Sequence, residues 1–111
     1  MVGIESGIDM GREAVTSQML QDYRGFIADL LASRSLAADD STIRQVIVRF
    51  LDSDSAQIIA QAGEDRYKEV RNHATYTGHD GNEASYLGEM GKSRIIKAET
   101  ERELRVIVEQ I

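Results

Sequence analysis

The sequence predicts a mostly α-helical domain of four to five helices, and it allows a short β-hairpin near residues 84–97. Two observations lead to the helical prediction. Apolar residues recur at steps of three and four residues through long segments, which is the spacing of one helix face. Polar breaks rich in Asp and Ser, which favour helix N-termini, separate these segments, and the chain has no proline. We expect a flexible N-terminus over 1–8 and a single helical domain over 9–111, because this length allows one modest core.

The first expected helix spans about 9–33 and is long for a chain of this size. Its apolar positions form one stripe, and polar residues such as Arg12 and Asp22 fall on the opposite face. A long helix with a single apolar stripe is a natural element of a dimer or a helical bundle. We therefore predict a homodimer whose contact face contains Val15, Met19, Tyr23, Phe26 and Leu30.

Two further segments fit the helical spacing. Residues 43–51 place polar side chains between pairs of apolar ones, which favours a helix. The β-branched run 46–48 keeps a buried strand as the competing interpretation. A third helix is expected over 55–72, and Gly63 would divide it in two if a turn follows there.

The C-terminal part of the chain is harder to assign. Residues 71–93 hold both histidines and four glycines, so we expect a long, Gly-hinged connection. Within it, residues 91–93 (Gly-Lys-Ser) resemble the end of a phosphate-binding loop but lack its first glycine, and a hairpin turn is the simpler interpretation. Residues 94–97 are expected to form a short strand. A capping-box pattern at Thr100 predicts a last helix, with a strand in 104–111 as the alternative.

Composition excludes several classes of protein. The net charge of −6 argues against a generally basic nucleic-acid-binding surface, although a local basic face remains compatible with it. The chain has no cysteine, so disulfides and thiolate zinc sites are excluded. No apolar run approaches the roughly 20 residues that a membrane-spanning helix needs, and no signal peptide is recognisable. A soluble, cytoplasmic protein without membrane contact is the expectation.

The histidines suggest two kinds of chemistry. His73 and His79, with Asp80 and Glu83, are residue types that bind Zn, Mn, Fe or Ni, but a five-residue gap between the histidines is not a helical ligand spacing. We therefore predict no metal and no other cofactor.

Histidine is also the commonest general acid or base. The run Arg71, Asn72, His73 and His79 loosely resembles the Arg-Asn-…-His motif of the helical HEPN ribonucleases. The register differs from that family, because His79 lies eight residues beyond Arg71 and His73 lies seven beyond Arg66. The resemblance would imply a small His-dependent nuclease, and a helix end that carries His and Arg is the simpler interpretation.

A DNA-binding arrangement is the main alternative function. Residues 55–63 and 66–73 would form a helix-turn-helix, and a β-hairpin over 86–97 would form a following wing. The residues expected to contact nucleic acid or another partner are Arg66, Lys68, Arg71, Asn72, His73, Lys92 and Arg94.

The function favoured by the sequence is that of a small interaction or regulatory protein. It would act through helical contacts with a protein partner, without an enzymatic activity, and it would form a homodimer through the first helix. A winged-helix-like DNA-binding regulator that uses residues 55–97 is the alternative, and a His-dependent nuclease is the third choice. No catalytic residue is assigned.

Overall fold

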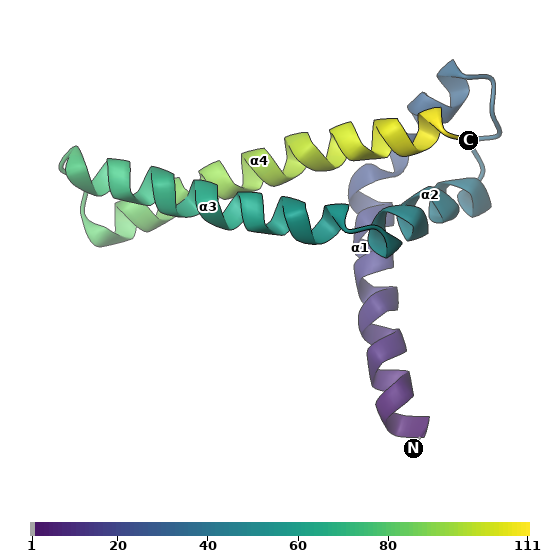
Figure 1. Ribbon diagram of the computed structural model, residues 1–111, viewed down its shortest axis with the longest axis horizontal. Helices are drawn as coiled ribbons and strands as arrows, with labels where there is room; N and C mark the ends of the chain where they lie inside the picture. The colour runs from purple at the N-terminus through teal and green to yellow at the C-terminus, as the bar shows by residue number, and fades with distance from the viewer. Residues whose placement is uncertain (1) are drawn as a thin grey trace. The chain divides into compact units, whose positions relative to one another are not determined.

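The computed structural model describes the backbone of residues 2–111 and the side chains of residues 11–111. Its helices are α1 (Val2–Ser33), α2 (Asp40–Asp52), α3 (Ser55–Tyr76) and α4 (Gly81–Glu109) (Figure 1). No strand occurs in this described part of the chain, so the prediction of a mostly α-helical fold is confirmed. None of these helices is both long and apolar enough to span a bilayer, as far as the described residues show.

The chain divides into two compact units. The first comprises Met1–Asp52 with Leu104–Ile111, and the second comprises Ser53–Glu103. The expectation of a single domain over 9–111 stays a prediction. The flexible N-terminus expected over 1–8 also stays one, because residue 1 and the side chains that follow it lie outside the described residues.

The first unit buries apolar side chains at helical spacing. In α2 the buried positions are Ile43, Val46, Ile47 and Phe50, which lie on one face of a helix. The interpretation of 43–51 as a strand is therefore wrong, because two of its three β-branched residues point into a helical core. The strand alternative for 104–111 is also wrong, since the end of α4 runs through it to Glu109. The remaining core residues of this unit are Met19, Ile27, Leu31, Leu104, Ile107 and Val108.

Helices α1 and α2 run antiparallel within this unit. Arg12 Nη2 lies 2.6 Å from Asp52 Oδ1 at the end of α2, and Arg24 Nη1 lies 3.4 Å from Asp40 Oδ1 at its start. These pairs are exposed, so each adds at most about 1 kcal/mol to stability. Together with the apolar contacts, they match the two ends of α2 to Arg12 and Arg24 of α1.

Local hydrogen bonds explain where α1 stops and α2 begins. The Leu36 N–H donates to the carbonyl of Leu31 at 2.9 Å, and Ser35 between them has a left-handed φ of 58°. This arrangement is a Schellman motif, which satisfies the last carbonyls of a helix. Asp39 then caps α2, since its Oδ1 accepts a hydrogen bond from the Thr42 N–H at 2.8 Å. Hydrogen bonds from the backbone and the side chain of Thr42 lower the pKa of the Asp39 carboxyl below its usual 3.8.

The second unit is an antiparallel helical hairpin, and the connection between α3 and α4 is only four residues long. The His79 N–H donates to the carbonyl of Ala74 at 3.0 Å, and Gly78 adopts the φ of 97° that ends α3. Asp80 Oδ1 then accepts the Glu83 N–H at 2.7 Å and caps α4. The motif that ends α3 and the cap that begins α4 therefore account for the whole four-residue connection.

Several predictions for this region are wrong. The β-hairpin near 84–97 and the strand at 94–97 are absent, because α4 is continuous through both. The connection expected over 71–93 is mostly helix, and the Gly-Lys-Ser run at 91–93 lies inside α4. Helix α3 also passes unbroken through Gly63, so the turn of the expected helix-turn-helix does not form.

The glycines of this unit explain the errors. A Cβ atom on Gly63 would lie 2.7 Å from Ile96 Cδ1, and one on Gly88 would lie 2.9 Å from Tyr67 Cδ2. Both distances are shorter than any van der Waals contact between carbon atoms. These glycines therefore let α3 and α4 approach closely inside regular helices, and they do not form turns. The tertiary contact outweighs the helix propensity of roughly 1 kcal/mol that each glycine gives up.

Candidate partner-binding groove

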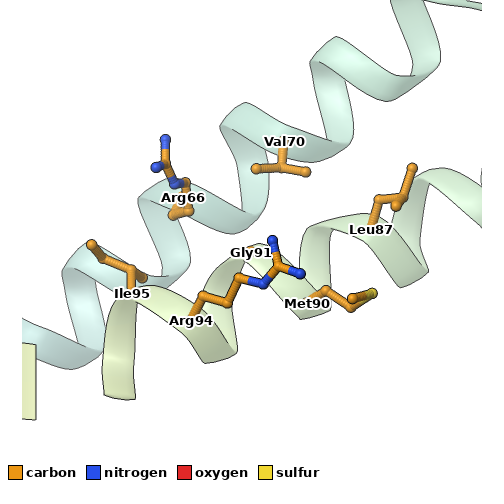
Figure 2. A pocket seen from close by; sticks show the side chains of 7 residues that line it. All are labelled: Arg66, Val70, Leu87, Met90, Gly91, Arg94 and Ile95. Atoms are coloured by element: carbon orange, nitrogen blue, oxygen red, sulfur yellow. The ribbon is translucent and has the colours of Figure 1, made fainter. Parts of the chain in front are cut away.

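A groove of about 420 Å³ runs along one side of the α3–α4 hairpin (Figure 2). Two of its lining side chains come from α3 and the others from α4. The lining residues are Arg66, Val70, Leu87, Met90, Gly91, Arg94 and Ile95. All of them belong to the second unit.

The floor of the groove is apolar because the two helices approach closely there. A Cβ atom on Gly91 would lie 2.8 Å from Val70 Cγ2, so a larger residue at this crossing would displace the Val70 side chain. Leu87, Met90 and Ile95 of α4 are half-buried and continue the floor on either side of it. Such partly exposed apolar side chains are the type that partner proteins cover.

Two arginines flank this floor in different electrostatic states. The aliphatic stem of Arg66 lies beside Gly91, and its Nη1 is 3.4 Å from Glu69 Oε2. Arg94 extends along α4 toward Met90 (Figure 2), is exposed, and has no hydrogen-bond or ion-pair partner among the described residues. The groove thus carries one neutralised guanidinium and one free guanidinium.

Most arginines of the described chain have a partner. Carboxylates pair with Arg12, Arg24, Arg44, Arg66 and Arg102. Arg34 donates to the carbonyl of Val108 at 2.8 Å, and Arg105 lies 5.7 Å from the centre of the Phe26 ring. Besides Arg94, only Arg49 and Arg71 lack such a partner among the described residues, and neither lines the groove.

Lys92 belongs to a different surface from Arg94. Its Nζ contacts Glu64 Oε1, and together they line a second hollow with Gln57 and Ile96. The hydrogen bond to Glu64 raises the pKa of Lys92, so the side chain stays protonated. The Glu64 carboxylate balances its positive charge. The predicted contact residues therefore do not form one basic surface.

The remaining predicted contact residues lie exposed on α3. Lys68, Arg71, Asn72 and His73 line neither of these hollows. Lys68 and Arg71 have no ion-pair partner among the residues that the structure describes.

The histidines occupy the two helix ends at the tip of the hairpin. His73 is exposed, and its carbonyl accepts hydrogen bonds from the Thr77 N–H at 3.0 Å and from Thr77 Oγ1 at 3.1 Å. His79 Nδ1 lies 3.1 Å from Glu83 Oε1. No cluster of three or more metal-ligating side chains occurs among the described residues.

The predicted dimer face of α1 overlaps the core of its own unit. Met19 is only 8% exposed, and Tyr23, Phe26 and Leu30 are half-buried, whereas Val15 is 48% exposed. The fully buried residues of α1 are Thr16, Ile27 and Leu31. Each of them follows a residue of the predicted dimer face by one position. Of the five predicted residues, Val15 thus offers the most free surface.

The sequence did not single out the groove floor. Leu87, Met90 and Ile95 were assigned to a loop and a strand, so their shared position on one helix face was not recognised. A partial signal was present, because Met90 follows Tyr86 by four residues and Leu87 by three, which are helical steps. The neighbouring glycines obscured it.

The chain matches no known protein family model, and no curated protein or solved structure is significantly similar to it. Its function is therefore argued from its own surfaces.

Proposed function

We propose that this chain is a small interaction or regulatory protein that presents helical surfaces to protein partners. The groove along the α3–α4 hairpin is the observation that supports this function most directly. Its lining combines an apolar floor with guanidinium groups, a composition typical of protein-binding surfaces. Both sides of the groove are regular helices held together by glycine contacts, so the surface is preorganised.

Large exposed apolar side chains support the same proposal. Tyr86 is 64% exposed and Ile58 is 66% exposed. Exposed apolar residues are common singly, but Tyr86 shares a shallow hollow with Met90 and Arg94 of the groove. The apolar surface along this side of α4 is therefore continuous.

Self-association through α1 is the second part of the proposal. Helix α1 is 32 residues long, or about 48 Å at 1.5 Å per residue, whereas α2 is 13 residues long, or about 20 Å. Helix α2 can therefore cover less than half the length of α1. Val15 lies in the part of α1 that runs beside α2, yet it is 48% exposed, so a second copy of the chain on this side would cover surface that α2 leaves open.

Sedimentation equilibrium at high micromolar concentration tests this self-association. We expect a dimer that the Val15→Glu variant shifts to monomer, because a buried carboxylate would oppose the contact. Ala14→Glu is the control, since Ala14 is exposed and lies one residue away on a different face. A monomer at every concentration would refute the dimer. Equal effects of the two variants would place the contact elsewhere.

DNA binding remains a second candidate because Lys68 and Arg71 are exposed on α3 without ion-pair partners in the described chain. The continuous helices α3 and α4 remove the turn and the wing of the expected motif, so contact would be with phosphates along one straight helix. Retention of duplex DNA that weakens with salt and in the Arg66→Ala, Arg71→Ala double variant would support it. Absence of retention at low salt would eliminate it.

A further inference from the structure

One side of α4 combines the groove with a neighbouring hollow. Met90 and Arg94 line both, so the surface continues from Ile95 to Tyr86. This span is about 14 Å at 1.5 Å per residue, which matches the apolar face of two to three turns of another helix. The length of the surface therefore fits a helical occupant.

One cation that lines this surface has no partner among the described residues. The carboxylate of Glu69 is neutralised by Arg66 across a 3.4 Å ion pair. Glu89, which lines the neighbouring hollow, has only a longer-range electrostatic interaction with Lys92, whose ion pair is with Glu64. Among the arginines that line the groove, Arg94 has no partner in the described chain, although the chain carries a net charge of −6 and has acidic residues in excess.

An unpaired arginine beside half-buried apolar side chains favours a carboxylate from outside. A guanidinium presents two parallel N–H donors, which match both oxygens of a carboxylate. Once apolar side chains of the occupant cover Met90 and Leu87, water is excluded and this hydrogen bond becomes stronger. Methionine in the floor adapts to side chains of different shape.

We infer that the groove binds an acidic amphipathic α-helix of a partner protein. Apolar side chains at helical spacing on that helix would fill the floor formed by Val70, Leu87 and Met90, as in other helix-in-groove complexes. A flanking Glu or Asp would bind Arg94. This inference rests on the proposed function, because it names the partner class for the surface on which that function depends.

Binding of designed peptides tests the partner class directly. The probe is a fluorescein-labelled, lactam-stapled peptide of about 18 residues, long enough for a stable helix, with Leu at positions i, i+3, i+4 and i+7 and Glu on both flanks. Its counterpart has Lys in place of each Glu. Anisotropy measured with the full chain at physiological salt, which screens the overall charge of −6, should show the acidic peptide binding at least about tenfold more tightly than the basic one, because like charges would face Arg94 in the second case.

Variants at Arg94 localise the contact. Arg94→Gln should weaken binding of the acidic peptide by about fivefold, Arg94→Lys should retain part of it, and Arg94→Glu should reverse the preference. Arg71→Glu is the matched control, because Arg71 is also an exposed arginine without a partner among the described residues and lies outside the groove. It makes the same change in net charge and should alter the affinity by only about twofold at physiological salt. Circular dichroism of each variant verifies the helical fold.

The outcomes separate this inference from the broader proposal. Equal binding of both peptides, lost in Met90→Gln but not in Arg94→Gln, would retain helix docking and overturn the acidic class. No binding of either peptide would overturn the inference while the sedimentation test of self-association stands. Equal weakening by Arg94→Glu and Arg71→Glu would also overturn it, because the attraction would then come from overall charge. A groove occupied by a second copy would appear as a dimer disrupted by Met90→Gln, which likewise refutes it.

Discussion

Replacing Gly88 by alanine measures how closely α3 and α4 approach. A Cβ at this position would lie 2.9 Å from Tyr67 Cδ2 and 3.0 Å from the Tyr67 carbonyl oxygen. The ring can rotate away, but the carbonyl belongs to the backbone of α3 and moves only if the helices separate. Forcing extra atoms into such a contact costs about 1–3 kcal/mol, against a gain in helix propensity of about 1 kcal/mol.

A second glycine isolates the contact from the propensity. Gly25 lies inside α1 with nothing within 4 Å of a Cβ, so Gly25→Ala should stabilise the protein by about 0.5–1 kcal/mol. The propensity gain is common to both substitutions. The difference between the two changes in unfolding free energy therefore reports the steric cost alone, which we expect to be about 1–3 kcal/mol.

Urea denaturation followed by circular dichroism is the assay. Gly25 and Gly88 lie in different units, so each change is read from the transition of its own unit if two transitions appear. Stabilisation by Gly88→Ala equal to that by Gly25→Ala would refute the reasoning, because the helices would then be separated by at least one more methyl group at this position.

Three other predictions concern the first unit. Leu31→Ala, at a position with no exposed surface, should lower the free energy of unfolding by about 2–5 kcal/mol in urea denaturation, and a loss below 1 kcal/mol would mean that α1 packs differently there. Ser35→Gly should stabilise the chain by up to about 1 kcal/mol in the same assay, because glycine adopts the φ of 58° without strain, and a loss of stability would argue against the Schellman motif. The pKa of Asp39 is lowered in the folded chain by hydrogen bonds from Thr42, so its ionised form stabilises the protein above pH 3.8 and this contribution disappears as the pH falls through the lower, folded pKa. The stability difference between the wild type and Asp39→Asn should accordingly be constant above about pH 5 and shrink below 3.8, and a difference independent of pH would contradict the assigned cap.

The sequence predicted the first three helices because their patterns are local. Apolar residues at helical steps and Asp or Ser in the breaks place α2 and α3 close to their observed bounds, and they place the end of α1 at Ser33, whereas α1 begins at Val2 and not at the expected residue 9. In residues 43–51 the spacing of the apolar pairs outweighed the β-branched run, and the structure confirms a helix there. Such patterns depend only on neighbours within one or two turns.

The candidate site was predicted only in part. Arg66 and Arg94 were both selected as contact residues, and the structure places them along one groove. Lys92 was selected with them but lies with Glu64 on another surface, although it is only two residues from Arg94. On a helix, residues two apart do not share a face. Once 84–97 was interpreted as a possible hairpin, this separation was not recognised.

The sequence by itself therefore determined that this protein is helical, acidic and without cysteine, and it determined where α2 and α3 begin. The tertiary structure alone decided the meaning of the glycines in the second half of the chain. A glycine favours a turn when its neighbours are considered alone, but Gly63, Gly88 and Gly91 each face a side chain of the opposing helix at a distance that excludes a Cβ. That requirement arises between residues 21 to 33 positions apart, and no local pattern contains it. The same close contact holds α3 and α4 together and forms the floor of the groove.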